Sequence, residues 1–251
     1  MADYNWAEME GKDILKALED DPRAMQACKW GDISAFAWIV LLKARPELAS
    51  KCDWRNLPAW NQMRILLVHP ELASLADLSG LEGGEAVELL LKQPDITAAI
   101  PWEKLSSKHW EKLLSSQPQF ADKCDFSQFS GEEWGSLLVS QPQFADKCDF
   151  GLLSGEDWRY LLASEPQFAD KCDFDLLSGE DWAYLLFLQP QFADECDFGL
   201  LSGEDWAYLL SEETQFADEC DFSLLSDEDW DFLLERQPQF AKKRNSAAQK
   251  D

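Results

Sequence analysis

The chain has 251 residues, of which 46% are hydrophobic, and this content excludes an intrinsically disordered protein. The net charge of −26 argues against direct binding to nucleic acid, because phosphates would be repelled. No apolar run is long enough to cross a bilayer, and the acidic first residues do not resemble a signal peptide, so we expect a cytoplasmic protein without membrane contact.

A period of 24 residues organises the sequence. Tryptophan recurs at this spacing, a proline slot follows eight residues later, and a second aromatic slot, which begins at Trp6, follows after eight more. The tryptophans of the regular part are Trp110, Trp134, Trp158, Trp182, Trp206 and Trp230. The proline slot runs from Pro22 to Pro238 with Thr214 as an exception. Such self-similarity predicts about ten tandem units that form a single solenoid domain over residues 1–245, followed by a flexible tail at 246–251.

The units over residues 6–101 are degenerate. Gln62 and Ala86 replace the tryptophan, and Pro58 occupies the slot that holds the capping serine in the regular units. The units over 102–245 are regular, and the last one carries Arg244 and Asn245 where cysteine and aspartate stand elsewhere. Polar residues in core slots are what a terminal cap requires, so we expect the array to end there.

One unit, residues 154–177, shows the expected fold. Ser154 and Asp157 resemble a capping box that begins a helix, and Trp158 with two leucines marks its buried face. Pro166 ends this helix and favours the start of a second short one, after which Phe174 lies in a connector suited to a 3₁₀ turn. No stretch alternates with period two. Because so small a unit cannot bury its apolar face alone, we predict an all-α solenoid of stacked units.

The repeated "QPQFADKCDF…SGEDW…LL" pattern resembles the short PQFADKCDW tandem repeats of uncharacterised bacterial proteins. This resemblance covers residues 102–241 well and 6–101 more loosely. The length and helix plan of the unit are also similar to those of the leucine-rich repeat variant family, although that family's arginine and asparagine signature is absent. Both resemblances imply an α-solenoid of the interaction type, and neither brings a catalytic residue.

The seven cysteines all occupy one slot of the repeat, and Ala76 or Ile100 stands there in other units. A packing position accepts these replacements, whereas a metal-binding or redox position does not. Equivalent atoms one helix spacing apart, about 8–10 Å, are also beyond disulfide reach. We therefore expect buried, reduced thiols and no metal. The cysteines are Cys28, Cys52, Cys124, Cys148, Cys172, Cys196 and Cys220.

No catalytic arrangement is evident. The tryptophans lie beside leucines, which favours core packing over a ligand platform. His69 and His109 occupy different slots and are interpreted as exposed or incidental. There is no glycine-rich phosphate loop, metal-ligand cluster or nucleophile elbow, so we predict a non-catalytic protein without cofactor or small-molecule substrate.

Four slots after each tryptophan, at offsets of one, two, five and six residues, lie opposite the buried face on a helical wheel. They are predicted to face outward or into a groove, and their aromatic and apolar members would form a ribbon typical of protein-binding surfaces. Packing of these side chains over neighbouring units is the alternative. The candidate binding residues are Tyr160, Tyr184, Phe187, Leu188, Tyr208 and Phe232.

The charge is concentrated in the regular units. Residues 126–240 hold 27 acidic against 4 basic residues, a net −23. A protein-interaction scaffold is the favoured function, and a basic protein is one partner that its charge would suit. The alternative is an acidic nucleic-acid mimic that inhibits a DNA- or RNA-binding protein. Capping and solubility alone also account for many of these carboxylates.

Overall fold

The computed structural model describes residues 4–21 and 23–247, which leaves Pro22 of the predicted proline slot outside the described residues. Within these residues the chain contains α-helices, 3₁₀-helices and turns, and no strand. The repeated helical units confirm the predicted all-α solenoid class. The chain divides into two compact units, Met1–Asp125 and Phe126–Asp251, which are described separately below.

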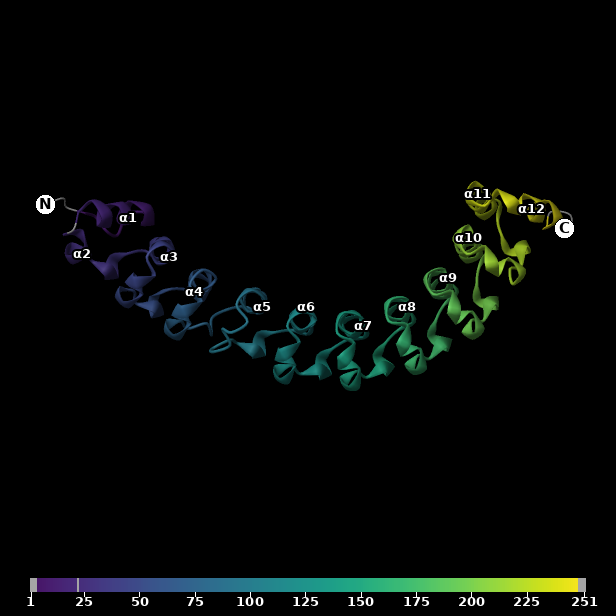
Figure 1. The fold of residues 1–251 in the computed structure, drawn as a ribbon, viewed down its shortest axis with the longest axis horizontal. Helices are drawn as coiled ribbons and strands as arrows, with labels where there is room; N and C mark the ends of the chain where they lie inside the picture. Colours follow the sequence, from purple (N-terminus) through teal and green to yellow (C-terminus); the bar gives the residue numbers. More distant parts are fainter. Residues whose placement is uncertain (1–3, 22, 248–251) are drawn as a thin grey trace. The chain divides into compact units, whose positions relative to one another are not determined.

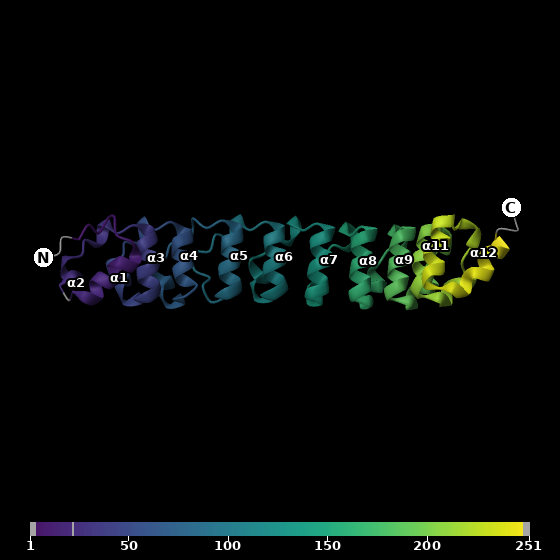
Figure 2. The same ribbon diagram turned by 90° about the horizontal axis from the view of Figure 1, so that it is seen from above.

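In the first unit, successive α-helices pack side by side, α3 against α1 and α4, and α5 against α6 (Figure 2). The α-helices are α1 (Gly11–Asp20), α2 (Ala24–Ala27), α3 (Ala35–Ala44), α4 (Ala59–Leu66), α5 (Gly83–Lys92) and α6 (Ser107–Ser116). The 3₁₀-helices between them are η1 (Trp30–Asp32), η2 (Pro46–Lys51), η3 (Trp54–Asn56), η4 (Pro70–Leu75), η5 (Trp102–Lys104) and η6 (Pro118–Lys123).

In the second unit, each of α7 to α10 packs on the next, and the row curves with the α-helices along its concave side and the 3₁₀-helices along its convex side (Figure 1). The α-helices are α7 (Gly131–Ser140), α8 (Gly155–Ser164), α9 (Gly179–Leu188), α10 (Gly203–Glu212), α11 (Asp227–Arg236) and α12 (Ala241–Ala247). The longer 3₁₀-helices are η8 (Pro142–Lys147), η10 (Pro166–Lys171), η12 (Pro190–Glu195) and η14 (Thr214–Asp218). The three-residue ones are η7 (Phe126–Gln128), η9 (Phe150–Leu152), η11 (Phe174–Leu176), η13 (Phe198–Leu200), η15 (Phe222–Leu224) and η16 (Pro238–Phe240).

Each regular α-helix begins with the predicted capping box. At the start of α8, the Oγ of Ser154 accepts from the backbone N–H of Asp157, whose carboxylate accepts from the Ser154 N–H at 2.9 Å and hydroxyl at 2.7 Å. These bonds satisfy donors that a helix start otherwise leaves unpaired. Pro166 then opens η10, so the second short helix of the unit is a 3₁₀-helix that ends before Cys172.

Aromatic stacking joins the connectors to the α-helices. The ring of Phe174 lies 5.4 Å from that of Trp182 and 6.1 Å from that of Phe192, and the same contacts recur along the second unit. Trp182 is 1% exposed, and the other tryptophans of this slot are similarly buried. The tryptophans are therefore core residues, as predicted, and the second aromatic slot provides their stacking partner.

The first residue of each helix from α7 to α10 is glycine, and the next unit approaches it closely. A Cβ atom at Gly179 would lie 2.2 Å from the carbonyl oxygen of Leu200, and the equivalent carbonyls crowd Gly155 and Gly203 in the same way. Asp227 fills this slot in the last regular helix, where its carboxylate accepts from Arg244 at 2.9 Å. Glycine thus sets the spacing between units.

The degenerate units replace the conserved packing with other contacts. Gln62, in the tryptophan slot, is 2% exposed, and its Nε2 donates to the carbonyls of Trp54 and Leu57 at 3.0 and 2.8 Å. Its Oε1 accepts from the Asp77 backbone N–H at 2.7 Å, which ties this unit to the following segment. Glutamine is smaller than tryptophan and packs less surface, and the hydrogen bonds of its amide offset part of this loss.

The C-terminal end departs from the predicted boundaries. The predicted flexible tail began at residue 246, but α12 continues to Ala247, and residues 248–251 lie outside the described part of the chain. Arg244 donates to Asp231 at 2.8 Å as well as to Asp227, and the ammonium of Lys243 lies 5.1 Å from the Phe222 ring centroid. These polar contacts cover the end of the stack, as expected of a cap.

Candidate functional site

Five of the six candidate binding residues are exposed. Tyr160 is the most accessible at 50%, while Tyr184, Leu188, Tyr208 and Phe232 are between 36% and 42% exposed. They lie on α8 to α11, opposite the buried tryptophan and leucines, on helices that line the concave side of the second unit (Figure 1). We call this set of exposed side chains, together with Phe187, the aromatic ribbon.

Phe187 is the exception in the ribbon, because it is half-buried rather than outward-facing. Its ring lies 5.6 Å from that of Tyr208 on the next helix, so it packs between α9 and α10. Burial also raises the pKa of Tyr208, with smaller contributions from Tyr184 and Glu212. Both proposed roles of these side chains therefore occur together: Phe187 completes the packing under a Tyr208 ring that remains accessible.

Two of the four slots predicted to face outward or into a groove are covered in the middle of the row, although Asp231 and Glu235 of the last regular helix are exposed in these slots. At the first position after tryptophan, Gly135, Ala183 and Ala207 are buried, and at the fifth position Ser211 is 4% exposed. Both slots lie on the flanks of the helix, where the neighbouring helices of the stack pack. The slots at offsets of two and six residues are the accessible ones, and they carry the exposed part of the ribbon.

A row of glutamates runs beside the ribbon. It lies in the first turn of each helix from α7 to α11, and from α8 on it stands four residues before the aromatic. Its members are Glu132, Glu156, Glu180, Glu204 and Glu228. The side chains of Glu156 and Glu180 are 79% and 84% exposed. Residues four apart share one face of a helix, so the second unit presents carboxylates and aromatic rings together.

Arg159 connects the two rows. Its guanidinium carbon lies 5.0 Å from the ring centroid of Tyr184, and its nitrogens lie 3.8 Å from Glu180 and 3.5 Å from Asp181. A third contact, 3.4 Å long, joins it to Glu156 on its own helix. Arg159 thus shows that an arginine fits between two helices with its charge on carboxylates and its plane near a tyrosine.

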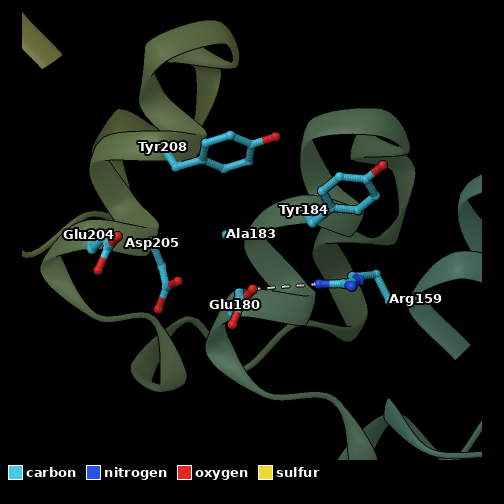
Figure 3. Close-up of a pocket in the computed structure, with 7 residues that line it drawn as sticks. All are labelled: Arg159, Glu180, Ala183, Tyr184, Glu204, Asp205 and Tyr208. Atoms are coloured by element: carbon cyan, nitrogen blue, oxygen red, sulfur yellow. Dashed lines mark ion pairs between the residues drawn. The ribbon is translucent and has the colours of Figure 1, made fainter. Parts of the chain in front are cut away.

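A groove of about 430 Å³ lies beside this arginine. Figure 3 shows Tyr184 and Tyr208 projecting from neighbouring helices, with Ala183 between them and the carboxylates of Glu180, Glu204 and Asp205 below. The lining residues are Arg159, Glu180, Ala183, Tyr184, Glu204, Asp205 and Tyr208. The groove is therefore acidic and aromatic, which suits a cationic side chain.

Sequence reasoning missed Arg159 and a second exposed apolar row on the connectors. In the slot that follows the tryptophan of the regular units, Arg159 is the single large cation among glycine, alanines and acidic residues. The second row is 48% to 51% exposed, and leucine at a fixed offset in four units was the available signal. Its members are Leu152, Leu176, Leu200 and Leu224.

The cysteine and histidine predictions need correction. Of the cysteines, Cys28 is buried, but the other six are half-buried. His69 and His109 are half-buried with structural contacts: His69 Nε2 lies 3.1 Å from the Lys43 carbonyl oxygen, and His109 Nδ1 accepts from the Ser106 N–H at 3.2 Å in a capping box. Among the described residues no group of three or more histidine, cysteine and acidic side chains is arranged to hold a metal ion.

No family model matches the sequence, and neither a curated protein nor a solved structure matches it. In the described part of the chain, every helix is too short or too polar to cross a bilayer. The physical character of the ribbon and of the glutamate row is therefore the basis for a functional proposal.

Proposed function

We propose that the chain is a non-catalytic interaction scaffold that binds a basic protein through the aromatic ribbon and the glutamate row. The observation that carries this proposal is the repetition, on successive helices, of an exposed aromatic ring beside an exposed carboxylate. Tyrosine and phenylalanine are enriched in protein interfaces, and complementary charge steers and orients a partner. A rigid stack of helices holds these groups in place before binding, which lowers the entropic cost of association.

The first test identifies the partner by affinity capture from the cells that make the protein, and then measures its affinity for purified variants. Tyr184→Ala and Leu188→Ala each remove exposed apolar surface, so at least one should weaken binding about thirtyfold, the effect of a hot-spot truncation. Leu176→Ala removes a similarly exposed leucine from a connector and serves as the control. Unchanged affinity in both ribbon variants, with unchanged thermal stability, would contradict the proposal.

The second candidate function is nucleic-acid mimicry. Residues 126–240 hold 27 acidic residues against 4 basic ones, and this charge favours mimicry because a long acidic surface can occupy the groove of a DNA- or RNA-binding protein. In that case Glu204→Gln combined with Glu228→Gln should weaken binding more than either ribbon variant. Binding should also fall steeply with salt and compete with DNA, whereas binding by the ribbon survives moderate salt.

A further inference from the structure

The contacts of Arg159 can be followed one repeat along the chain. Adding 24 residues to Glu180, Asp181 and Tyr184 gives Glu204, Asp205 and Tyr208, so the same three acceptors recur on α10. Adding 24 to Arg159 gives Ala183, which has no charged side chain. The groove therefore lies where a second arginine would lie if the repeat were perfect (Figure 3).

The acceptor atoms in this place are available. Asp181 uses Oδ2 for its capping box, and Arg159 contacts its Oδ1 at 3.5 Å. Asp205 uses Oδ2 in the same way for Ser202 at 2.9 Å, and its Oδ1 has no hydrogen bond or ion pair within the described residues. Glu204 is exposed and likewise makes no ion pair there.

The other arginine of residues 126–240 supports the same chemical preference. The guanidinium carbon of Arg236 lies 4.0 Å from the ring centroid of Phe232, so both arginines of this segment cover a ring of the ribbon. One unit before Arg159, Gly135 leaves Tyr160 uncovered, but Glu156 already contacts Arg159 at 3.4 Å. Among the ribbon aromatics that no arginine covers, Tyr208 is the one whose equivalent glutamate and aspartate oxygens both remain open.

We propose that Ala183, Glu204, Asp205 and Tyr208 form a subsite for an arginine side chain of the partner protein. This inference rests on the proposed scaffold function and names the group that the surface recognises. Arginine suits the subsite better than lysine, because its planar guanidinium stacks on the ring while its fork of donors reaches two carboxylates. A lysine ammonium satisfies the charge but provides no stacking plane.

The test uses the full chain and two fluorescent peptides of equal length, one with arginine and one with lysine at alternate positions. The wild-type protein should bind the arginine peptide roughly threefold more tightly, because both peptides carry the charge and only the planar guanidinium stacks on an exposed ring. Ala183→Arg should fill the subsite as Arg159 fills its own. The ratio of the affinities for the arginine and the lysine peptide should then fall toward one. Tyr208→Ala removes the ring and should have the same effect.

Gln191→Arg is the matched control, since it adds the same charge at an exposed position of η12. It should weaken the binding of both peptides equally and leave the arginine preference unchanged. Equal affinity of the wild type for the two peptides would overturn the subsite, as would an arginine preference that persists in both Ala183→Arg and Tyr208→Ala. If the natural partner still requires Tyr184 or Leu188 in that event, the scaffold function stands and only the subsite is wrong.

Discussion

The side-chain Nε2 of Gln189 donates a hydrogen bond of 2.7 Å to the carbonyl oxygen of Ala163, 26 residues earlier and one unit back. The same spacing joins Gln237 to Ser211, Gln93 to Leu67 and, through an imidazole, His69 to Lys43. These accepting carbonyls lie in the last turn of an α-helix or directly after it, where the helix itself leaves them unpaired. In these four units the residue before the proline therefore links neighbouring units.

Glu165 occupies this slot but cannot donate. Its Oε2 accepts from Gln167, as the Oε1 of Gln189 accepts from Gln191, but a carboxylate has no proton for the carbonyl of Val139. Glu165→Gln should add this bond and raise the free energy of unfolding by about 0.5–1.5 kcal/mol. Urea denaturation measures the change.

Glu195→Gln is the control for this gain, because it removes the same negative charge from an exposed position on η12. If both substitutions stabilise the protein equally, the effect comes from reduced charge repulsion and not from a hydrogen bond between units.

The glycines give a second prediction, in which two Gly→Ala substitutions change the stability in opposite directions. Gly179→Ala should destabilise the junction between α9 and α10, because its Cβ would meet the Leu200 carbonyl at 2.2 Å. Gly135→Ala should stabilise α7 by up to about 1 kcal/mol, the difference in helix propensity. The nearest atoms there are 3.7 Å from the added Cβ, and Ala183 and Ala207 already fill this slot. Thermal unfolding of both variants measures the two changes. A change of melting temperature in the same direction for both would contradict the prediction.

A third prediction concerns two adjacent buried amides. Asn61 is 1% exposed, and neither its Nδ2 nor its Oδ1 has a hydrogen-bond partner in the described structure. In the regular units the residue at the equivalent position accepts from the N–H and hydroxyl of the capping serine. In this unit the capping position holds Pro58, which has neither an N–H nor a hydroxyl. Asn61→Ala should therefore raise the free energy of unfolding by about 1 kcal/mol, since an unsatisfied buried group costs about 1–3 kcal/mol and some packing is lost.

Gln62→Ala should act in the opposite direction. It removes three hydrogen bonds to the backbone, opens a cavity and should lower stability by about 2 kcal/mol or more. Chemical denaturation of the two variants separates the cases. A loss of stability in Asn61→Ala as large as that in Gln62→Ala would show that Asn61 has a partner in solution.

Much of this fold could be predicted from the sequence because the repeat units of the one chain can be compared with each other. The capping serine, the core tryptophan and the three-residue 3₁₀ turn at Phe174 each recur at a fixed offset, and their roles follow from local chemistry. The second helix could not be assigned as 3₁₀ in the same way. Its form shows in bonds of the i−3 type, such as Cys172 N–H to the Ala169 carbonyl, which side-chain spacing over six residues does not distinguish from α.

The exposure of the candidate binding residues was predicted only in part, for a physical reason. A helical wheel treats one helix alone, whereas a helix in a stack is covered on both flanks as well as underneath. The wheel predicted that Ala183 and Phe187 face outward or into a groove. In the stack Ala183 is buried where it lines the groove, and Phe187 packs against Tyr208 of the next helix. Likewise, the importance of Arg159 could not be seen until its contacts across the unit boundary were known.

The cysteines give the last prediction, which concerns alkaline pH. Burial is the main cause that raises the pKa of the Cys172 thiol from 9.0 to about 12, and the neighbouring Asp173 adds to the shift. The pKa of Cys196 is raised to about 12 for the same reasons. Between pH 9 and 12 the unfolded chain therefore loses these protons before the folded chain does. Because the unfolded state then binds fewer protons, the thiols contribute fully to the free energy of unfolding below pH 9. This contribution should fall as the pH rises towards 12.

The double variant Cys172→Ala with Cys196→Ala isolates the contribution of these two thiols to the pH dependence of stability. Ala76 occupies the same slot in another unit, so the fold should tolerate both changes. Urea unfolding midpoints, measured below pH 9 and again near pH 11, should differ less in the double variant than in the wild type. Equal losses in both proteins would mean that the thiols are ionised as readily in the folded chain as in the unfolded one, and that their burial does not couple to folding.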